Sequence, residues 1–207
     1  MNSHTSMPLG QIYSLFPIAL GHYKLNRRLT ETELHTIQQT SQKSNTGNRV
    51  SVSDQVCESA ELSSLTEFFQ TSLNDYVQQV HAPAGTQVVI SSSWINWSRT
   101  GEHHHKHTHT NSFISGVFYV QTNPDDKIWF HDDTHKWLSM PKSVYTNWNS
   151  EQFYYKVTQG DLYLFPSNLP HSVAVVQGAQ ERISLSFNTW PKGILGDTNT
   201  KTSLQLT

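Results

Sequence analysis

The chain has 207 residues with a formal net charge of −2 and a single cysteine, Cys57, and no apolar run approaches the length of a membrane span. This length predicts one domain covering residues 1–207. A nearly neutral chain without a basic field argues against nucleic acid or an anionic membrane as partner, and one cysteine excludes an intramolecular disulfide. We therefore expect a cytoplasmic protein that acts on a small molecule or a peptide. The oligomeric state is left open.

The first part of the chain, to about residue 82, is predicted to contain the helices. We expect a first strand around residues 12–19. Thr30, followed by carboxylates at Glu31 and Glu33, indicates a capped helix start, with the helix running to about Gln42. The polar segment 41–54 is predicted to be an exposed loop. Between residues 60 and 80 apolar residues recur at helical spacing, which indicates a helix packed on the core.

From about residue 86 to 190 the sequence changes to β-branched and aromatic runs separated by turns. So many strands without intervening helices predict an antiparallel sandwich or jelly roll. The fold class is then mainly β (α+β), with the N-terminal helices packed on one sheet. The tail 192–207 is predicted to be a loosely held extension. The predicted strands are 87–97, 113–121, 127–131, 153–157, 161–165, 171–176 and 182–189.

Histidines in two places suggest a metal site. His107 and His109 are two residues apart, so on an extended strand their imidazoles would point to the same side and could bind one ion. His171, at the start of a later apolar strand, could be the third ligand. Three ligands on one face leave positions open for a chelating co-substrate and O₂, as in non-haem Fe(II) oxygenases. However, residues 103–109 contain five histidines, so an adventitious surface tract, or a site using His105 with His107, remains an alternative.

A polar strand face provides a second indication of a ligand site. Along 182–187, Arg182, Ser184 and Ser186 alternate with Ile183, Leu185 and Phe187, and polar groups on one face of a buried strand indicate a cavity. The planar guanidinium of Arg182 suits a carboxylate, which it can bind with two parallel hydrogen bonds. Three aromatic residues could line the cavity or belong to the plain core: Trp97, Tyr119 and Trp129.

Several sequence blocks resemble a known family. They are Trp94-Ile95-Asn96-Trp97, the run from His107 to Val120, Ile128-Trp129-Phe130, Gly160 to Ser167, and the stretch from His171 to Asn188. Together they are similar to the putative 2-oxoglutarate and Fe(II)-dependent oxygenases, which are common in marine bacteria and their phages and distantly related to prolyl 4-hydroxylases. The resemblance covers roughly residues 92–188, and Leu15-Phe16-Pro17 also looks like the family's start. It implies a double-stranded β-helix.

The resemblance further implies a 2-oxoglutarate-dependent dioxygenase, a hydroxylase that uses Fe(II), 2-oxoglutarate and O₂ and releases succinate and CO₂. The implied metal ligands and catalytic residues are His107, His109 and His171. Arg182, Ser184 and Tyr119 are the implied co-substrate residues. Most such oxygenases have Asp or Glu two residues after the first histidine, where this chain has His109. The metal is then held by three histidines, or Asp132 or Asp133 is recruited as the acidic ligand.

Two other functions compete with this interpretation. A cupin-like dioxygenase with three histidine ligands would bind its substrate directly and use no 2-oxoglutarate. A non-catalytic jelly-roll module, such as a phage structural protein, would merely bind metal, and three histidines would also suit zinc. The prime substrate is expected to contact the loops 41–54 and 134–152. A peptidyl or free amino acid and a nucleotide are therefore all open.

Overall fold

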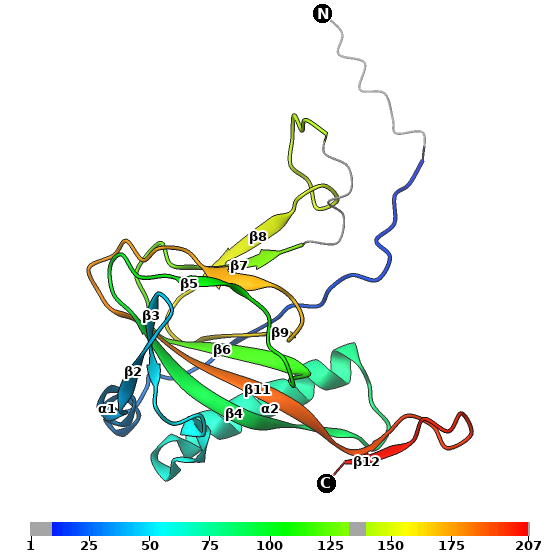
Figure 1. Ribbon diagram of the computed structural model, residues 1–207, viewed down its shortest axis with the longest axis horizontal. Coiled ribbons are helices and arrows are strands. Elements are labelled where there is room, and N and C mark those ends of the chain that lie inside the picture. Colours follow the sequence, from blue (N-terminus) through cyan, green and yellow to red (C-terminus); the bar gives the residue numbers. More distant parts are fainter. Residues whose placement is uncertain (1–9, 133–139, 207) are drawn as a thin grey trace, which may run out of the picture.

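The computed structural model describes residues 10–132 and 140–206 and shows two facing antiparallel sheets, with the long helix lying against the larger one (Figure 1). The mainly β fold class with helices on one sheet is confirmed. The helices are α1 (Glu31–Gln39) and α2 (Ser63–Val80), with the short 3-10 helices η1 (Val56–Glu58) and η2 (Ala60–Leu62) between them. Among the described residues, no helix has both the length and the apolarity needed to cross a membrane.

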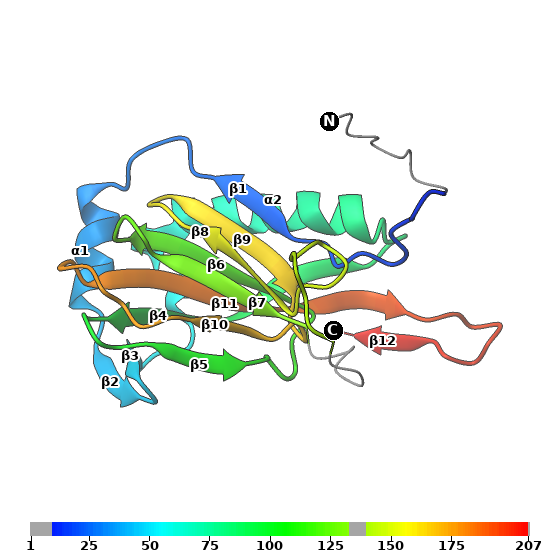
Figure 2. The same ribbon diagram turned by 90° about the horizontal axis from the view of Figure 1, so that it is seen from above.

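The larger sheet has the strand order β1-β9-β6-β11-β4-β3-β2, with β12 paired to β11, and the smaller sheet has the order β5-β10-β7-β8. Figure 2 shows the smaller sheet stacked over the larger one. The strands are β1 (Gly21–Lys24), β2 (Gln42–Asn45), β3 (Asn48–Ser51), β4 (Gln87–Ser98), β5 (His104–His107), β6 (Ile114–Gln121), β7 (Lys127–His131), β8 (Gln152–Lys156), β9 (Asp161–Pro166), β10 (His171–Val173), β11 (Arg182–Leu195) and β12 (Leu204–Leu206).

Side chains on the two faces of β11 point into two different parts of the protein interior. Ile183, Leu185 and Phe187 face α2 and join the main core, where the ring centroids of Phe69 and Phe187 are 5.3 Å apart. Burial of each large apolar side chain contributes about 1.5–3 kcal/mol. Gly116 on β6 belongs to this packing, because a Cβ there would lie 2.1 Å from the Phe187 ring. The opposite face of β11 looks into the space between the sheets, and that face is the polar one.

The helix start predicted at Thr30 is confirmed, with α1 ending at Gln39. The Thr30 hydroxyl accepts a hydrogen bond from the Glu33 amide at 3.1 Å, and the Glu33 carboxylate accepts one from the Thr30 amide at 2.8 Å. This reciprocal capping box satisfies amides that would otherwise have no partner in the first turn. Arg27 also donates to both carboxylate oxygens of Glu33.

Three N- and C-terminal predictions were wrong. Residues 12–19 form no strand, and the first strand is β1, which pairs with β9. The segment 41–54 is not a loop: it contains the β2–β3 hairpin, with Gly47 at φ +84° in its turn. The tail is not loosely held at its start, because β11 continues to Leu195 and pairs with β12. The strand β2 is wholly exposed and polar, and β1 has only four residues, so neither carries an apolar alternation that the sequence could reveal.

Candidate metal centre

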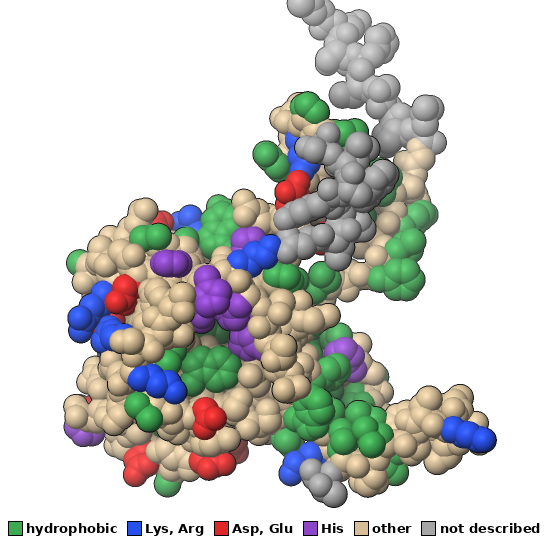
Figure 3. All heavy atoms as spheres, in the orientation of Figure 1, with side chains coloured by type: hydrophobic (Ala, Val, Ile, Leu, Met, Phe, Trp, Pro, Cys, Tyr) green, Lys and Arg blue, Asp and Glu red, His purple; other side chains and the backbone are tan. Residues whose placement is uncertain are grey.

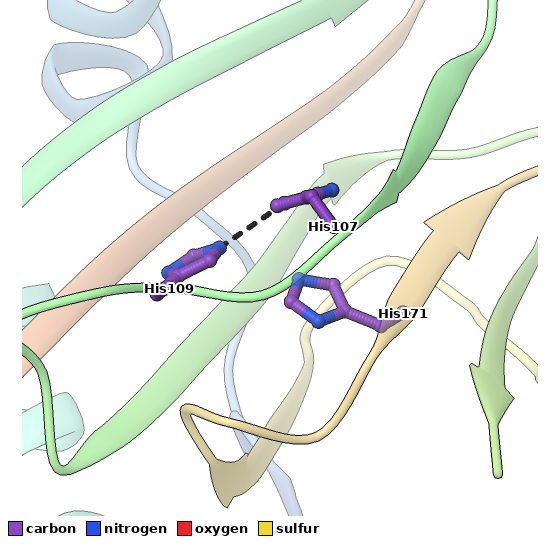
Figure 4. A group of neighbouring side chains, drawn as sticks. All are labelled: His107, His109 and His171. Carbon is purple, nitrogen blue, oxygen red and sulfur yellow. Dashed lines mark hydrogen bonds between the residues drawn. The ribbon is translucent and has the colours of Figure 1, made fainter. Parts of the chain in front are cut away.

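Pairing within the smaller sheet brings the predicted histidines together. His107 ends β5 and lies opposite His171 at the start of β10. His109 follows β5, where its amide donates to the Ser167 carbonyl at 2.9 Å and turns the chain back toward the site. One nitrogen from each of the three rings lies within 4.8 Å of the others. Figure 4 shows the three rings converging, with the Nε2 atoms of His107 and His109 3.1 Å apart.

The outer nitrogen of each ring has its own acceptor. Nδ1 of His107 lies 2.8 Å from the His105 carbonyl, and Nδ1 of His171 lies 2.9 Å from the Leu169 carbonyl. Nδ1 of His109 lies 2.5 Å from Oδ1 of Asn188 in the amide orientation of the structure. A carbonyl oxygen accepts a hydrogen, so these contacts place the ring hydrogen on Nδ1 and leave a lone pair on each Nε2. A cation between the Nε2 atoms would remove the resulting lone-pair repulsion.

Burial keeps these rings neutral. It lowers the pKa of His107 and of His109, and burial, reinforced by the neighbouring His107, lowers the pKa of His171 to about 3. Neutral imidazole is the form that ligates a metal, so binding at neutral pH displaces no proton from these rings. His104, stacked on His107 at 4.3 Å between centroids, also has its pKa lowered to about 3, first by burial.

The cavity beside the histidines extends between the sheets to Arg182. It is partly open to solvent, and both Ser184 and Ser186 line it. Figure 3 shows the histidines gathered around a hollow on this face of the molecule.

Arg182 is a buried cation with incomplete neutralisation. Its side chain is 3% exposed, and its Nε lies 3.8 Å from Oδ2 of Asp126, which is longer than a hydrogen bond. Its guanidinium carbon lies 5.1 Å from the centre of the Tyr119 ring. Neither Nε of Arg182 nor the buried Tyr119 hydroxyl has a hydrogen-bond partner among the described residues. Unpaired buried donors of this kind indicate an anionic ligand.

Other predicted site residues lie elsewhere. The His105 side chain is exposed and is not part of the ligand group, and Asp132 also does not join it. Among the described residues that group contains no carboxylate, whereas Asp133 lies outside the described residues. Trp97 belongs to the core beside α2, and the ring of Trp129 packs against that of Tyr154 at a tilt of 47°, with centroids 4.8 Å apart. Neither lines the cavity, although Tyr119 does.

Three residues of this site were not predicted from the sequence. Trp94 lines the cavity, with its ring centroid 5.5 Å from that of His109, and Asn96 lies on the same face of β4. Asn188 holds His109, as described above. Period-two alternation could have revealed them, since Trp94 and Asn96 share one strand face and Asn188 shares the face of Arg182.

Part of the chain matches a known protein family. Residues 92–188, just under half of the chain, match the sequence model of the family described as "Putative 2OG-Fe(II) oxygenase". The matched segment contains His107, His109, His171 and Arg182. This match confirms the family resemblance. At the level of the family, it also confirms the prediction of a 2-oxoglutarate-dependent dioxygenase that uses Fe(II), 2-oxoglutarate and O₂. No curated protein matches the chain by sequence.

Solved structures show the same fold at low sequence identity. HygX from Streptomyces hygroscopicus, crystallised with nickel, 2-oxoglutarate and hygromycin B, is 12% identical with a TM-score of 0.58, covering 83% of this chain and 82% of its own. A 2OG-Fe(II) oxygenase family oxidoreductase from Burkholderia pseudomallei is 12% identical at 0.57, covering 82% and 84%. A prolyl-4-hydroxylase from Pseudomonas putida is 12% identical at 0.51, covering 83% and 92%. The jelly-roll fold is thus confirmed.

Proposed function

We propose that this chain is a hydroxylase in which His107, His109 and His171 hold Fe(II), while Arg182, Ser184 and Tyr119 hold the distal carboxylate of 2-oxoglutarate. The observation that carries the proposal is a juxtaposition. One nitrogen from each of three neutral imidazoles converges beside a cavity, and a buried, incompletely neutralised Arg182 lies on the wall of the same cavity. A ligand that both chelates a metal and ends in a carboxylate satisfies both groups.

The residues present fit Fe(II) and its co-substrate. Three imidazoles are suitable first ligands for Fe(II) and leave positions open, and the unpaired Arg182 Nε and Tyr119 hydroxyl can donate to a carboxylate. When bound, Fe(II) with 2-oxoglutarate and O₂ supplies the oxidising power that hydroxylates a C–H bond, with release of succinate and CO₂. The protein's part is to orient the co-substrate and to keep water from it between the sheets.

The side chains that line the cavity mouth favour an uncharged, polar segment of substrate beside the metal. The outer hollow next to the histidines is lined by amides, hydroxyls, one indole and imidazoles, with no Asp, Glu, Lys or Arg among the described lining residues. An amino-acid residue, free or in a peptide, or a neutral part of a small molecule fits this lining. HygX is seen with the small molecule hygromycin B bound. The lining residues are Asn45, Trp94, Asn96, His104, His107, Thr108, His109, Thr110 and Asn188.

Anaerobic titration with Fe(II) and 2-oxoglutarate tests the metal and co-substrate assignments. We expect a visible metal-to-ligand charge-transfer band that requires both reagents. Substituting Ala for His107, His109 or His171 should abolish it, whereas His103→Ala, an exposed histidine of the same tract, should leave it intact. Metal binding without the band and without succinate formation would favour the cupin-like alternative. Equal, mild effects of all four substitutions would indicate an adventitious tract.

A further inference from the structure

A chain of carboxamides leads from the mouth of the site to the cavity between the sheets. Nδ2 of Asn45, in the β2–β3 hairpin, donates to Oδ1 of Asn48 at 2.9 Å. Nδ2 of Asn48 lies 3.4 Å from Oδ1 of Asn96, and Nδ2 of Asn96 donates to the Ser186 hydroxyl at 3.1 Å. Asn48 and Asn96 are each 5% exposed, and Ser186 is 8% exposed. Burying a side-chain amide costs desolvation free energy, so a continuous chain of buried amides calls for a functional explanation.

The direction of these hydrogen bonds determines whether the Ser186 hydroxyl is free to donate one to a ligand. Each amide, as oriented in the structure, donates toward the cavity, so the Ser186 oxygen accepts the last hydrogen bond. A serine hydroxyl carries one hydrogen of its own. No described residue accepts it, and Ser186 lines the cavity. Its hydrogen is therefore available to a ligand there.

The place of Ser186 on β11 selects which end of a ligand it meets. Arg182, Ser184, Ser186 and Asn188 follow one another on the same face of the strand, at steps of roughly 6.5–7 Å. Asn188 touches the metal-side histidine His109. Ser186 is thus one step from the residue that holds a metal ligand and two steps from Arg182. It lies toward the proposed metal position, whereas the guanidinium lies farther along the strand from it.

We propose that Ser186 donates a hydrogen bond to the metal-chelating carboxylate of 2-oxoglutarate, and that Asn96, supported by Asn48 and Asn45, is a positioning residue that fixes the direction of this hydroxyl. The proposal rests on the proposed function of the site. It assigns the two ends of the co-substrate to two different contacts, the Ser186 hydroxyl near the metal and the Arg182 guanidinium far from it.

The test compares Ser186→Ala with Arg182→Ala in two measurements. Calorimetry on the Mn(II)-loaded protein gives 2-oxoglutarate affinity, and both substitutions should weaken it by about tenfold or more, since a hydrogen bond to a charged group is lost. The charge-transfer band of the anaerobic Fe(II) protein at saturating 2-oxoglutarate separates them. Ser186→Ala should shift the band maximum, because the chelating carboxylate loses its donor. Arg182→Ala should not shift it, because the chelate is unchanged.

The matched control is Ser172→Ala, on the opposite wall of the same cavity, where the hydroxyl is engaged with Nε2 of His131 at 2.8 Å. It should leave both readings at wild-type values. Asn96→Ala should shift the band in the same direction as Ser186→Ala but less, and an unshifted band would remove the positioning role. A Ser186→Ala protein with wild-type affinity and band would overturn the proposal. A wild-type protein that binds Mn(II) but not 2-oxoglutarate would instead overturn the proposed function.

Discussion

His109 depends on Asn188 for its orientation. The Nδ1 atom of His109 is 2.5 Å from Oδ1 of Asn188 and 3.1 Å from the Ser115 hydroxyl. Among the described residues it has no backbone carbonyl partner of the kind that holds His107 and His171. Partners of this kind fix the tautomer and the ring angle of a metal ligand. His109, which takes the place of the usual carboxylate, is therefore the proposed ligand whose geometry should be most sensitive to a neighbouring side chain.

We predict that Asn188→Ala lowers metal affinity by about 10–100-fold, the usual effect of removing a residue that orients a histidine ligand. Asn188→Asp keeps an acceptor for the Nδ1 hydrogen and should retain most of the affinity. Mn(II) titration followed by calorimetry measures both. Equal affinities in Asn188→Ala and wild type would show that Ser115 alone orients the ring.

At the scale of elements, the first helix is fastened by a buried carboxylate. Burial alone would raise the pKa of Glu33, but hydrogen bonds from Arg27 and from the Thr30 amide and hydroxyl outweigh it and hold the pKa below its usual 4.5. A carboxylate whose pKa is depressed by folding stabilises the protein above its unfolded pKa. That stabilisation is lost as the pH falls through the folded value.

We therefore predict that Glu33→Gln lowers the free energy of unfolding at pH 7 and reduces its loss between pH 5 and pH 3. Urea unfolding at several pH values measures this, with Glu31→Gln as control, because Glu31 is in the same helical turn but exposed. Other carboxylates titrate equally in all three proteins and cancel. Parallel pH profiles for Glu33→Gln and wild type would contradict the prediction.

The elements that the sequence predicted well are those whose burial leaves a periodic pattern. The strands β4, β6, β7, β9 and β11 start within about one residue of their predicted bounds, and α2 starts at Ser63 rather than at residue 60, since apolar residues mark their buried faces. The β2–β3 hairpin was missed because Gln42–Asn45 is wholly exposed and polar. Its pairing depends on β4, a strand far away in the sequence, and no local pattern reports such a neighbour.

The candidate site shows the same division. The polar face of Arg182, Ser184 and Ser186 follows from the two-residue repeat of a strand. The predicted strand does not extend to His109, which lies beyond the end of β5 and is held by the bond from its amide to the Ser167 carbonyl. The Asn45–Asn48–Asn96 chain does not follow from this repeat, because it requires β3 to lie beside β4 and β4 beside β11. Sequence patterns thus pointed to the proposed ligands but not to the groups that would orient them. The single-domain organisation over residues 1–207 stays a prediction.

At the scale of the whole molecule, the residues of the proposed site come from both sheets. His107 and His171 belong to the smaller sheet, whereas Arg182 and Asn188 belong to the larger one. An ion together with 2-oxoglutarate would therefore bind only when the sheets face each other. A ligand that binds the folded but not the unfolded chain stabilises it by about 2.7 kcal/mol at a concentration of 100 times its dissociation constant.

For a chain of this length, that free energy corresponds to a rise in melting temperature of roughly 5–10 °C. We predict such a rise on adding Mn(II) and a further rise on adding 2-oxoglutarate, measured by thermal unfolding followed by circular dichroism. His107→Ala should lose both increments, because the co-substrate chelates through the ion. Arg182→Ala should keep the first increment and lose most of the second. A 2-oxoglutarate increment that persists without Mn(II) would mean that Arg182 binds the dicarboxylate independently of the metal, and the two halves of the site would then not act as one.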